Sequence, residues 1–345
     1  MLNSFNHFRA IAIIFIVAGH SFYVNGMVFD SFFSILIKNL ISGGTALFVF
    51  ISGFLFHYVF FKKFEYKKFI ISKAKNVMLP YLVLGFLPIF ILVYKGSEDF
   101  GGYFSPHGDD FFSMYIIPAI KYVFSGRFLT AYWYIPFIVV VFIMSPLHMV
   151  FIRKSLVFQL VFVFFLSLIA VFLHRPVDNI EVFQSVMYYT PVYLIGIMAS
   201  IYKEKVYDFL HGKDLVLLFV VLFFASFQTF IGDIGNYHKK PFEFGGGDLM
   251  FFQKLILCFF FMVWLNKFEK YNNRYVHSVA STSFTAFFLH PFILWFVGKL
   301  SGGSLAHDSW LLFSLFVFFT LVFCIIIAKV TKKIIPSYSR YIIGY

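Results

Sequence analysis

Residues 8–28 read FRAIAIIFIVAGHSFYVNGMV, and this stretch decides the fold class. It is long enough to cross the hydrocarbon core of a bilayer, which takes about 20 mostly apolar residues in an α-helix. Its one charged side chain is Arg9, and the apolar run continues past His20 without the small-residue cleavage site of a secretory signal. We therefore predict a retained transmembrane helix.

Further apolar runs follow along the whole chain, separated by charged segments or by segments rich in Gly and Pro. They cover residues 40–61, 77–94, 131–152, 155–173, 184–202, 214–232, 249–266, 279–299 and 309–331. Segment 111–126 is semi-apolar and is typical of an interfacial or re-entrant element. The sequence thus predicts an all-α, polytopic helical bundle of about ten transmembrane helices. We expect residues 1–345 to form a single transmembrane domain without a separate soluble domain.

The composition supports this fold class. Hydrophobic residues make up 61% of the 345 and charged residues 13%, with a mean hydropathy of +0.85, whereas soluble domains average about 45–50% and about 25%. These values exclude a soluble enzyme, a disordered protein and a nucleic-acid-binding domain. The net charge of +12 instead indicates Lys and Arg on cytoplasmic loops, because such an excess sets membrane topology. Counting charges along the runs predicts that both termini are cytoplasmic.

Two features of the loops and cysteines bear on function. The basic loop 62–75 holds six lysines and one acid, Glu65. Such a loop is attracted to anionic lipids, and it can equally attract a polyanionic cytosolic donor such as a coenzyme A thioester.

Cys258 and Cys324 both lie in apolar runs, which argues against a disulfide framework. The sequence shows no metal-ligand spacing, no phosphate-binding Gly-rich loop and no Gly-x-Ser-x-Gly motif, so we expect no metal site.

Arg9 and His20 are the first candidates for chemistry, because ionisable residues in a membrane helix are costly. Eleven residues separate them, which places them within about 20° of one helix face and about 16 Å apart along the axis. They can line one groove, with Arg9 at the cytoplasmic mouth to hold an anion and His20 near the middle of the bilayer to take a proton from a hydroxyl. Alternatively, Arg9 reaches lipid headgroups and His20 is a hydrogen-bonded packing residue.

A second polar group lies on the predicted helix 279–299, where Ser283 precedes His290 and Pro291. This helix also starts from the cytoplasmic side, so His290 lies at a depth similar to that of His20. The two imidazoles can face one cavity. The alternative is a proline-kinked helix whose Ser and His side chains satisfy the freed backbone groups.

Two weaker patterns complete the set. Residues 43–54 read GGTALFVFISGF, and their small residues favour close helix packing, although Ser52 with the following glycine can also expose backbone to a ligand. Arg127, Trp133 and Tyr134 lie near the outer end of the fourth run. They suit an aromatic belt at the membrane interface or an aromatic platform for a sugar with Arg127 as its polar partner.

Together these motifs resemble the acyltransferase-3 family of integral membrane acyltransferases. The resemblance is carried by Arg-x10-His at Arg9 and His20, by the run 44–54, by Tyr-Trp-Tyr-Ile-Pro at 132–136, and by the Ser-to-His-Pro segment 283–291. The motifs occur in the family's order across nearly the whole chain. The family's Arg-x-x-Arg element is missing before the third helix, where this chain has Lys73 and Lys75.

The resemblance implies a fold of ten helices and transfer of an acyl group, most often acetyl, from cytosolic acyl-coenzyme A to a hydroxyl of a cell-surface glycan or its lipid-linked precursor. It implies that Arg9 and His20 are essential, with His20 as general base or transient acyl carrier. We assign His290 as a second catalytic candidate that orients the acceptor or stabilises an oxyanion. Lys73, Lys75 and Ser52 are candidate donor contacts. The candidate acceptor contacts are Arg127, Trp133, Tyr134 and Ser283.

The expected partners are therefore acyl-coenzyme A, the glycan acceptor and membrane lipids, with no nucleic acid and no permanently bound cofactor. We expect a multi-pass protein of the bacterial inner membrane; the sequence leaves the oligomeric state open. A transporter of a glycan or small organic anion is the competing interpretation, although no inverted repeat supports it. A non-catalytic scaffold would not need histidines in the membrane on two helices.

Overall fold

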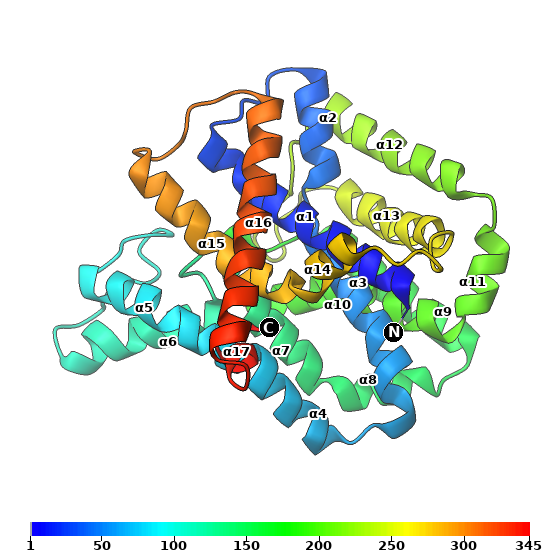
Figure 1. The fold of residues 1–345 in the computed structure, drawn as a ribbon, viewed down its shortest axis with the longest axis horizontal. Coiled ribbons are helices and arrows are strands. Elements are labelled where there is room, and N and C mark those ends of the chain that lie inside the picture. Colours follow the sequence, from blue (N-terminus) through cyan, green and yellow to red (C-terminus); the bar gives the residue numbers. More distant parts are fainter. Residues whose placement is uncertain (1) are drawn as a thin grey trace.

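A computed structural model describes residues 2–345, which form a bundle of helices with no β-strand in that range (Figure 1). The α-helices are α1 (Asn3–Asn25), α2 (Phe32–Ile41), α3 (Thr45–Leu55), α4 (Tyr66–Lys73), α5 (Leu79–Lys95), α6 (Ile117–Ser125), α7 (Tyr134–Ile143), α8 (Ser145–Ile152), α9 (Leu156–Leu173), α10 (Val182–Ile201), α11 (Lys203–Leu210), α12 (Asp214–Phe230), α13 (Leu249–Asn266), α14 (Arg274–Ser281), α15 (Ser283–Leu300), α16 (Trp310–Ile334) and α17 (Ser339–Ile343). Short π-helical turns, η1 (Phe56–Phe60), η3 (Ala74–Met78) and η4 (Phe112–Ile116), and 3₁₀ turns, η2 (Phe61–Lys63) and η5 (Val177–Asn179), join some of them.

The predicted membrane-spanning helices are present. Eight continuous helical segments are long and apolar enough to cross a bilayer, and two bent pairs bring the number to as many as ten. In the first pair, α7 and α8 meet at 56° where Pro146 enters the first turn of α8; in the second, α11 and α12 meet at 85° around Gly212. Residues 112–125 form a shorter apolar helix from η4 and α6, in the segment expected to be interfacial or re-entrant.

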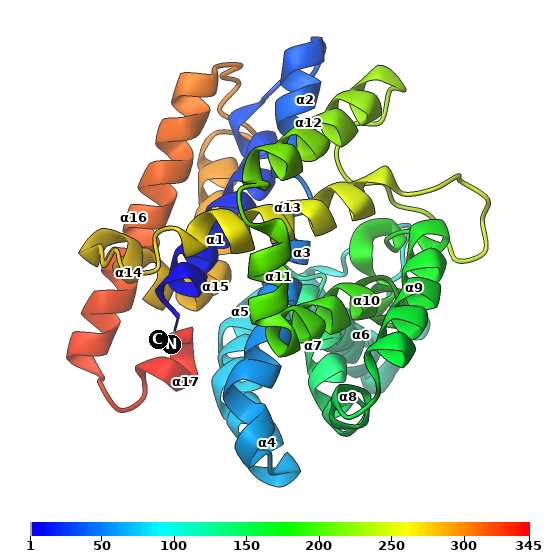
Figure 2. The ribbon, with the colours of Figure 1, turned by 90° about the vertical axis from the view of Figure 1, so that its right-hand side faces the viewer.

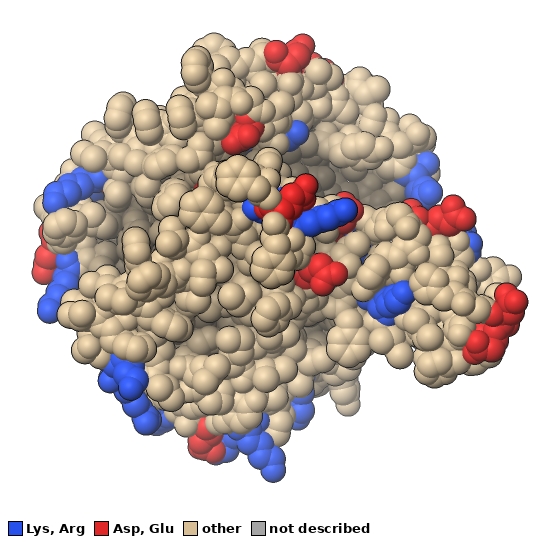
Figure 3. Space-filling view, turned by 180° about the vertical axis from the view of Figure 1, so that it is seen from behind, with Lys and Arg blue, Asp and Glu red and all other residues tan. Residues whose placement is uncertain are grey.

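Helix α1 lies in the middle of the bundle (Figures 1 and 2). It packs against α3, α13, α14, α15 and α16, while α3 packs mainly against α10. The outer helices bury little of their surface inside the protein. In α10, a central helix, 78% of an apolar 18-residue stretch is buried, whereas in α9, an outer helix, only 22% of such a stretch is buried. Figure 3 accordingly shows a face that is mostly uncharged, with its charged side chains in small groups. Such a surface suits contact with lipid.

Both ends of the chain lie in the lower half of the bundle, at the same height, in Figures 1 and 2. Helix α1 starts there and rises, and α16 descends from the opposite end to α17. Arg9 is therefore nearer to this end than His20 is. The site described below opens at the end of the bundle that carries both termini.

Two glycines set the spacing between α3 and α10. A Cβ atom added to Gly53 would overlap the backbone carbonyl of Tyr193, and one added to Gly196 would overlap that of Phe50. The two helices therefore touch backbone to backbone, the arrangement for which small residues are used in membranes. This confirms the close packing expected from the glycine-containing run 43–54. Because one face of α3 packs against α10, another face of α3 is available to line the site described below.

We predict that Gly53→Ala destabilises the folded bundle by about 1–3 kcal/mol, the usual cost of overpacking, because a backbone carbonyl cannot move aside as a side chain can. Thermal unfolding in detergent measures the effect. Gly19→Ala is the matched control, since nothing lies within 4 Å of an added Cβ at Gly19 and alanine is the better helix former. Equal unfolding temperatures for the two variants would contradict the backbone contact.

The start of α1 is held by a carboxylate from the loop after α13. The amides of Asn3 and Ser4 donate to Oε1 and Oε2 of Glu269, each at 2.8 Å. Burial raises the pKa of Glu269, but the hydrogen bonds from Ser4 and Asn3 outweigh it and hold the pKa below its ordinary value. The carboxylate satisfies amides that the first turn of a helix leaves free and interacts favourably with the helix dipole.

We predict that Glu269→Gln lowers stability by about 0.5–2 kcal/mol, the range for loss of a helix cap, when unfolding is measured at pH 7. Because the folded-state pKa is lowered, this difference is fully present above the ordinary value of 4.5 and disappears as the pH falls through the lowered pKa. Glu204→Gln, which removes an exposed carboxylate from α11, is the control. A difference from wild type that persists unchanged at pH 3 would refute the assignment.

Candidate functional site

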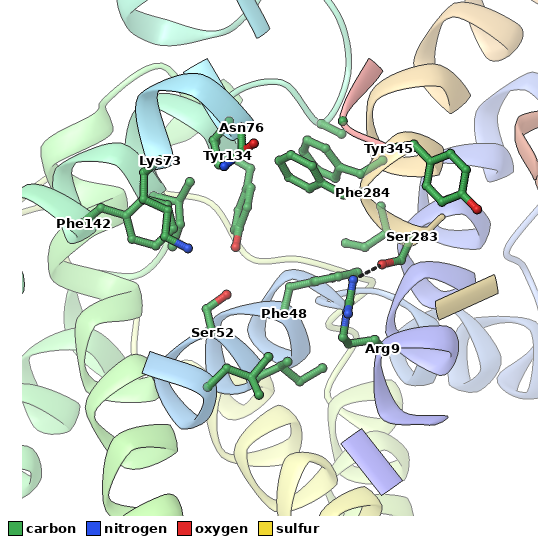
Figure 4. A pocket seen from close by; sticks show the side chains of 18 of the residues that line it. Arg9, Phe48, Ser52, Lys73, Asn76, Tyr134, Phe142, Ser283, Phe284 and Tyr345 are labelled. Carbon is green, nitrogen blue, oxygen red and sulfur yellow. Dashed lines mark hydrogen bonds between the residues drawn. The ribbon is translucent and has the colours of Figure 1, made fainter. Parts of the chain in front are cut away.

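One cavity of about 600 Å³ lies between α1, α3, α4, α7, α15 and the C-terminal segment (Figure 4). Its lining is Arg9, Ile16, His20, Thr45, Phe48, Ile51, Ser52, Leu55, Phe60, Ser72, Lys73, Asn76, Val77, Ala131, Trp133, Tyr134, Ile138, Phe142, Ser281, Ser283, Phe284, Phe287, Lys332, Arg340, Gly344 and Tyr345. Apolar and aromatic residues form the larger part of the lining, and eleven of the 26 residues carry polar or charged side chains; ligand sites combine both kinds.

Arg9 and Ser283 join two helices at the cavity wall. The Nη2 atom of Arg9 donates to Oγ of Ser283 at 3.1 Å, and that hydroxyl donates in turn to the carbonyl of Ala280 at 2.8 Å. Figure 4 shows Arg9 and Lys73 on opposite sides of the cavity, with Phe48 and Ser52 on one wall between them. Since Arg9 makes no ion pair with any of residues 2–345, most of its hydrogen-bonding capacity is left for a ligand.

His20 lies deeper along α1 and also faces the cavity. Its Nδ1 is 2.9 Å from Oγ1 of Thr130, in the loop between α6 and α7. When Nδ1–H donates to that hydroxyl, Nε2 carries the free lone pair and can accept a proton. His20 therefore has the nitrogen that a general base needs and a neighbour that fixes the ring.

The loop that carries Thr130 is held in an unusual conformation. Ala131, the next residue, is buried and has φ of 68°, in the left-handed region that non-glycine residues rarely adopt. The following residue, Tyr132, is fully buried and donates its hydroxyl to the carbonyl of Phe288 on α15 at 3.0 Å. Such backbone strain persists only where the surroundings impose it, so the position of Thr130 is tightly determined.

His290 lies beside His20, with the two ring centroids 5.5 Å apart. It is fully buried and does not line the cavity. Its Nδ1 is 2.8 Å from the carbonyl of Ala286, which can only accept, so Nδ1 carries the hydrogen and Nε2 is left as an acceptor without a partner. The ring therefore has no N–H to offer an oxyanion, and its free Nε2 is enclosed by protein and does not reach the cavity.

Cations gather at the cavity mouth without acids. Lys73 lies among three aromatic rings, with Nζ 4.7 Å from the centroid of Phe142, 5.0 Å from that of Phe60 and 5.1 Å from that of Phe69. Lys332 and Arg340 are exposed and complete the rim. None of the lining residues within 2–345 is Asp or Glu. A concave site of one charge sign attracts an oppositely charged ligand.

The structure brings together most of the residues that the sequence singled out: Arg9, His20, Ser52, Lys73, Trp133, Tyr134 and Ser283 all line the cavity. Trp133 and Tyr134 are buried, so these rings face the cavity instead of forming an exposed belt. Lys75 points to the exterior, and Arg127 lies outside the cavity, with its guanidinium 4.4 Å from the centroid of the Phe100 ring. Burial lowers the pKa of Arg127, while Asp178 and Asp99 act in the opposite direction.

Sequence reasoning missed Thr130, Lys332 and Arg340. Thr130 precedes the aromatic motif and carries no charge, so nothing marks it in the sequence. In the sequence, Lys332 and Arg340 are ordinary basic residues that follow the last predicted helix, 309–331. Residues 2–345 hold no group of three or more His, Cys, Asp and Glu side chains able to bind a metal ion.

One of three comparisons with known proteins gave a match. A family model described as an acyltransferase domain matches residues 2–329. The match covers the Arg9, His20, Thr130 and His290 positions but ends before Lys332 and Arg340. A search of curated proteins and a search of solved structures each gave no match.

Proposed function

Because this chain belongs to the acyltransferase-3 family and is a membrane acyltransferase, we propose that it moves an acyl group, by default acetyl, from cytosolic acyl-coenzyme A to a hydroxyl of a cell-surface glycan or its lipid-linked precursor. The observation that carries the proposal is a cavity whose lining holds no Asp or Glu and includes Lys73, Lys332 and Arg340 as well as His20. A donor that is anionic at one end and reactive at the other fits this distribution of charge.

The donor's placement follows from the lining. Its phosphate-bearing end is attracted to the exposed cations, and Arg9 can bind an anionic or carbonyl oxygen farther in. The apolar walls then accommodate an uncharged arm. The thioester at the end of that arm reaches the level of His20, about 16 Å beyond Arg9 along α1.

The chemistry needs one base and no covalent protein intermediate. Nε2 of His20 accepts the proton of the acceptor hydroxyl as its oxygen attacks the thioester carbonyl carbon. The tetrahedral intermediate collapses, the C–S bond breaks, and the departing sulfur takes the proton from the imidazolium. Thr130 accepts from Nδ1–H throughout and holds the ring in this tautomer. Nε2 of His290 is buried and His290 does not line the cavity, so we assign it no contact with the acceptor in this arrangement.

Topology gives this reaction a direction. We propose that the cationic mouth and both termini face the cytoplasm of a cell with this chain in its inner membrane, because basic residues are retained on the cytoplasmic side. Acyl-coenzyme A then enters from the side where it is made. The acceptor approaches His20 from elsewhere in the membrane, and Trp133 and Tyr134 offer it an aromatic wall.

We predict that His20→Gln lowers acyl transfer by at least about 10²-fold, since a positioned general base contributes about 10²–10⁴-fold. The assay uses inside-out membrane vesicles containing the acceptor glycan and radiolabelled acetyl-coenzyme A, with label followed into the glycan fraction. His148→Gln is the matched control, because it removes another buried imidazole, on α8, that does not line the cavity.

The outcomes separate three accounts. Loss of transfer in His20→Gln alone, at equal protein level, supports the base assignment. Transfer unaffected in His20→Gln keeps the activity but removes His20 as the base. No transfer by the wild type in membranes that hold the acceptor contradicts the proposed function and favours the transporter interpretation.

We further predict that Thr130→Val lowers kcat by about two- to tenfold and leaves the KM for acetyl-coenzyme A near the wild-type value. One hydrogen bond contributes about 0.5–1.5 kcal/mol, and 1.36 kcal/mol of activation free energy is a factor of about ten. Thr130→Ser keeps the hydroxyl and should restore the rate. Equal rates for the Val and Ser variants would show that the His20–Thr130 contact does not act in the reaction.

A further inference from the structure

The last segment of the chain supplies part of the cavity wall. Lys332, near the end of α16, lines the cavity together with Arg340, Gly344 and Tyr345. All of these lie beyond residue 329, where the family match ends. The family relationship therefore assigns them no role, and any role must be argued from their surroundings.

This segment is docked against the bundle. Ser339 and Ile343 are buried, and the Ser339 hydroxyl donates to the carbonyl of Tyr345 at 2.6 Å. Gly344 has φ of 80°, and a Cβ added there would come within 2.8 Å of the Phe284 ring. Helix α17 also packs on α5 and α15. The segment is thus a fixed wall of the mouth.

The wall brings charge to the mouth from a separate part of the fold. Lys332 and Arg340 join Lys73 of α4 around one opening. Nζ of Lys332 donates to the carbonyl of Pro336 at 3.0 Å, and neither cation forms an ion pair with any described carboxylate. The next residue, Lys333, is exposed and does not line the cavity. Like charges held together without a counterion favour a ligand with several negative charges.

We propose that Lys332 and Arg340 bind the phosphate groups at the nucleotide end of the acyl donor, so that the C-terminal segment is a phosphate-recognition element of the donor site. This rests on the proposed function for the identity of the donor. Arginine suits the task because its planar guanidinium pairs with two phosphate oxygens, while lysine acts as a point charge. An anionic lipid headgroup offers the same phosphate chemistry, and the experiment must distinguish the two sources.

The test measures equilibrium binding of labelled coenzyme A to the purified chain in phosphatidylcholine nanodiscs, which contain no net anionic lipid. Arg340→Gln and Lys332→Gln should each raise the Kd for coenzyme A about tenfold or more, because a hydrogen bond to a charged group is worth about 1.5–3 kcal/mol. Lys333→Gln is the matched control and should bind as wild type does. Pantetheine, which lacks the nucleotide, should bind all four proteins equally.

Unchanged coenzyme A affinity in both Arg340→Gln and Lys332→Gln would overturn the proposal, as would absence of binding to the wild type. A second outcome would also overturn the proposal: phosphatidylglycerol stabilises the wild type but not Arg340→Gln, while the two proteins bind coenzyme A equally well. In that case Lys332 and Arg340 bind lipid headgroups and not the acyl donor. Failure of the proposed reaction gives a different result. The wild type and the three variants then bind coenzyme A with the predicted relative affinities, but the wild type transfers no acyl group to a glycan.

Discussion

An unpaired polar group inside an apolar bundle costs several kcal/mol, and this cost organises the site. Lys254 shows the structural solution: its ammonium is buried on α13 and donates to the carbonyls of Asn39 and Leu40, where α2 ends. Arg9 and His20 are different. Each has one protein partner, Ser283 or Thr130, and each keeps capacity that faces an open cavity.

We propose that this unused hydrogen-bonding capacity distinguishes the candidate binding groups, Arg9 and His20, from polar side chains that only pack. The single hydrogen bond from Arg9 fixes its side chain against α15 and leaves other donors free, while the hydrogen bond of His20 leaves one ring nitrogen free. The crossing of α3 and α10 at Gly53 and Gly196 fixes the opposite wall, so Ser52 faces the cavity. Fixed elements on both sides give a preorganised site, which lowers the cost of holding reactants in place.

The sequence predicts the spans well, because the length of an apolar run is a direct measure of what can cross a bilayer. It also places Arg9 and His20 correctly on one face, since both lie in one uninterrupted helix. Helical geometry puts Lys73 and Lys75 on different faces, because they are two residues apart, but the sequence does not show that the face of Lys73 is the one that lines the cavity. Nor does it predict Thr130, whose partner is 110 residues away, or show that His290 lies beside His20 without lining the cavity.

In the proposed reaction, one cavity holds the acyl donor from a cationic mouth to His20. A structure of the chain determined with coenzyme A by electron cryo-microscopy tests it most directly. We predict density for the phosphates beside Lys73, Lys332 and Arg340, with the sulfur within contact distance of the His20 ring. Density for coenzyme A that reaches neither these cations nor His20 would contradict it.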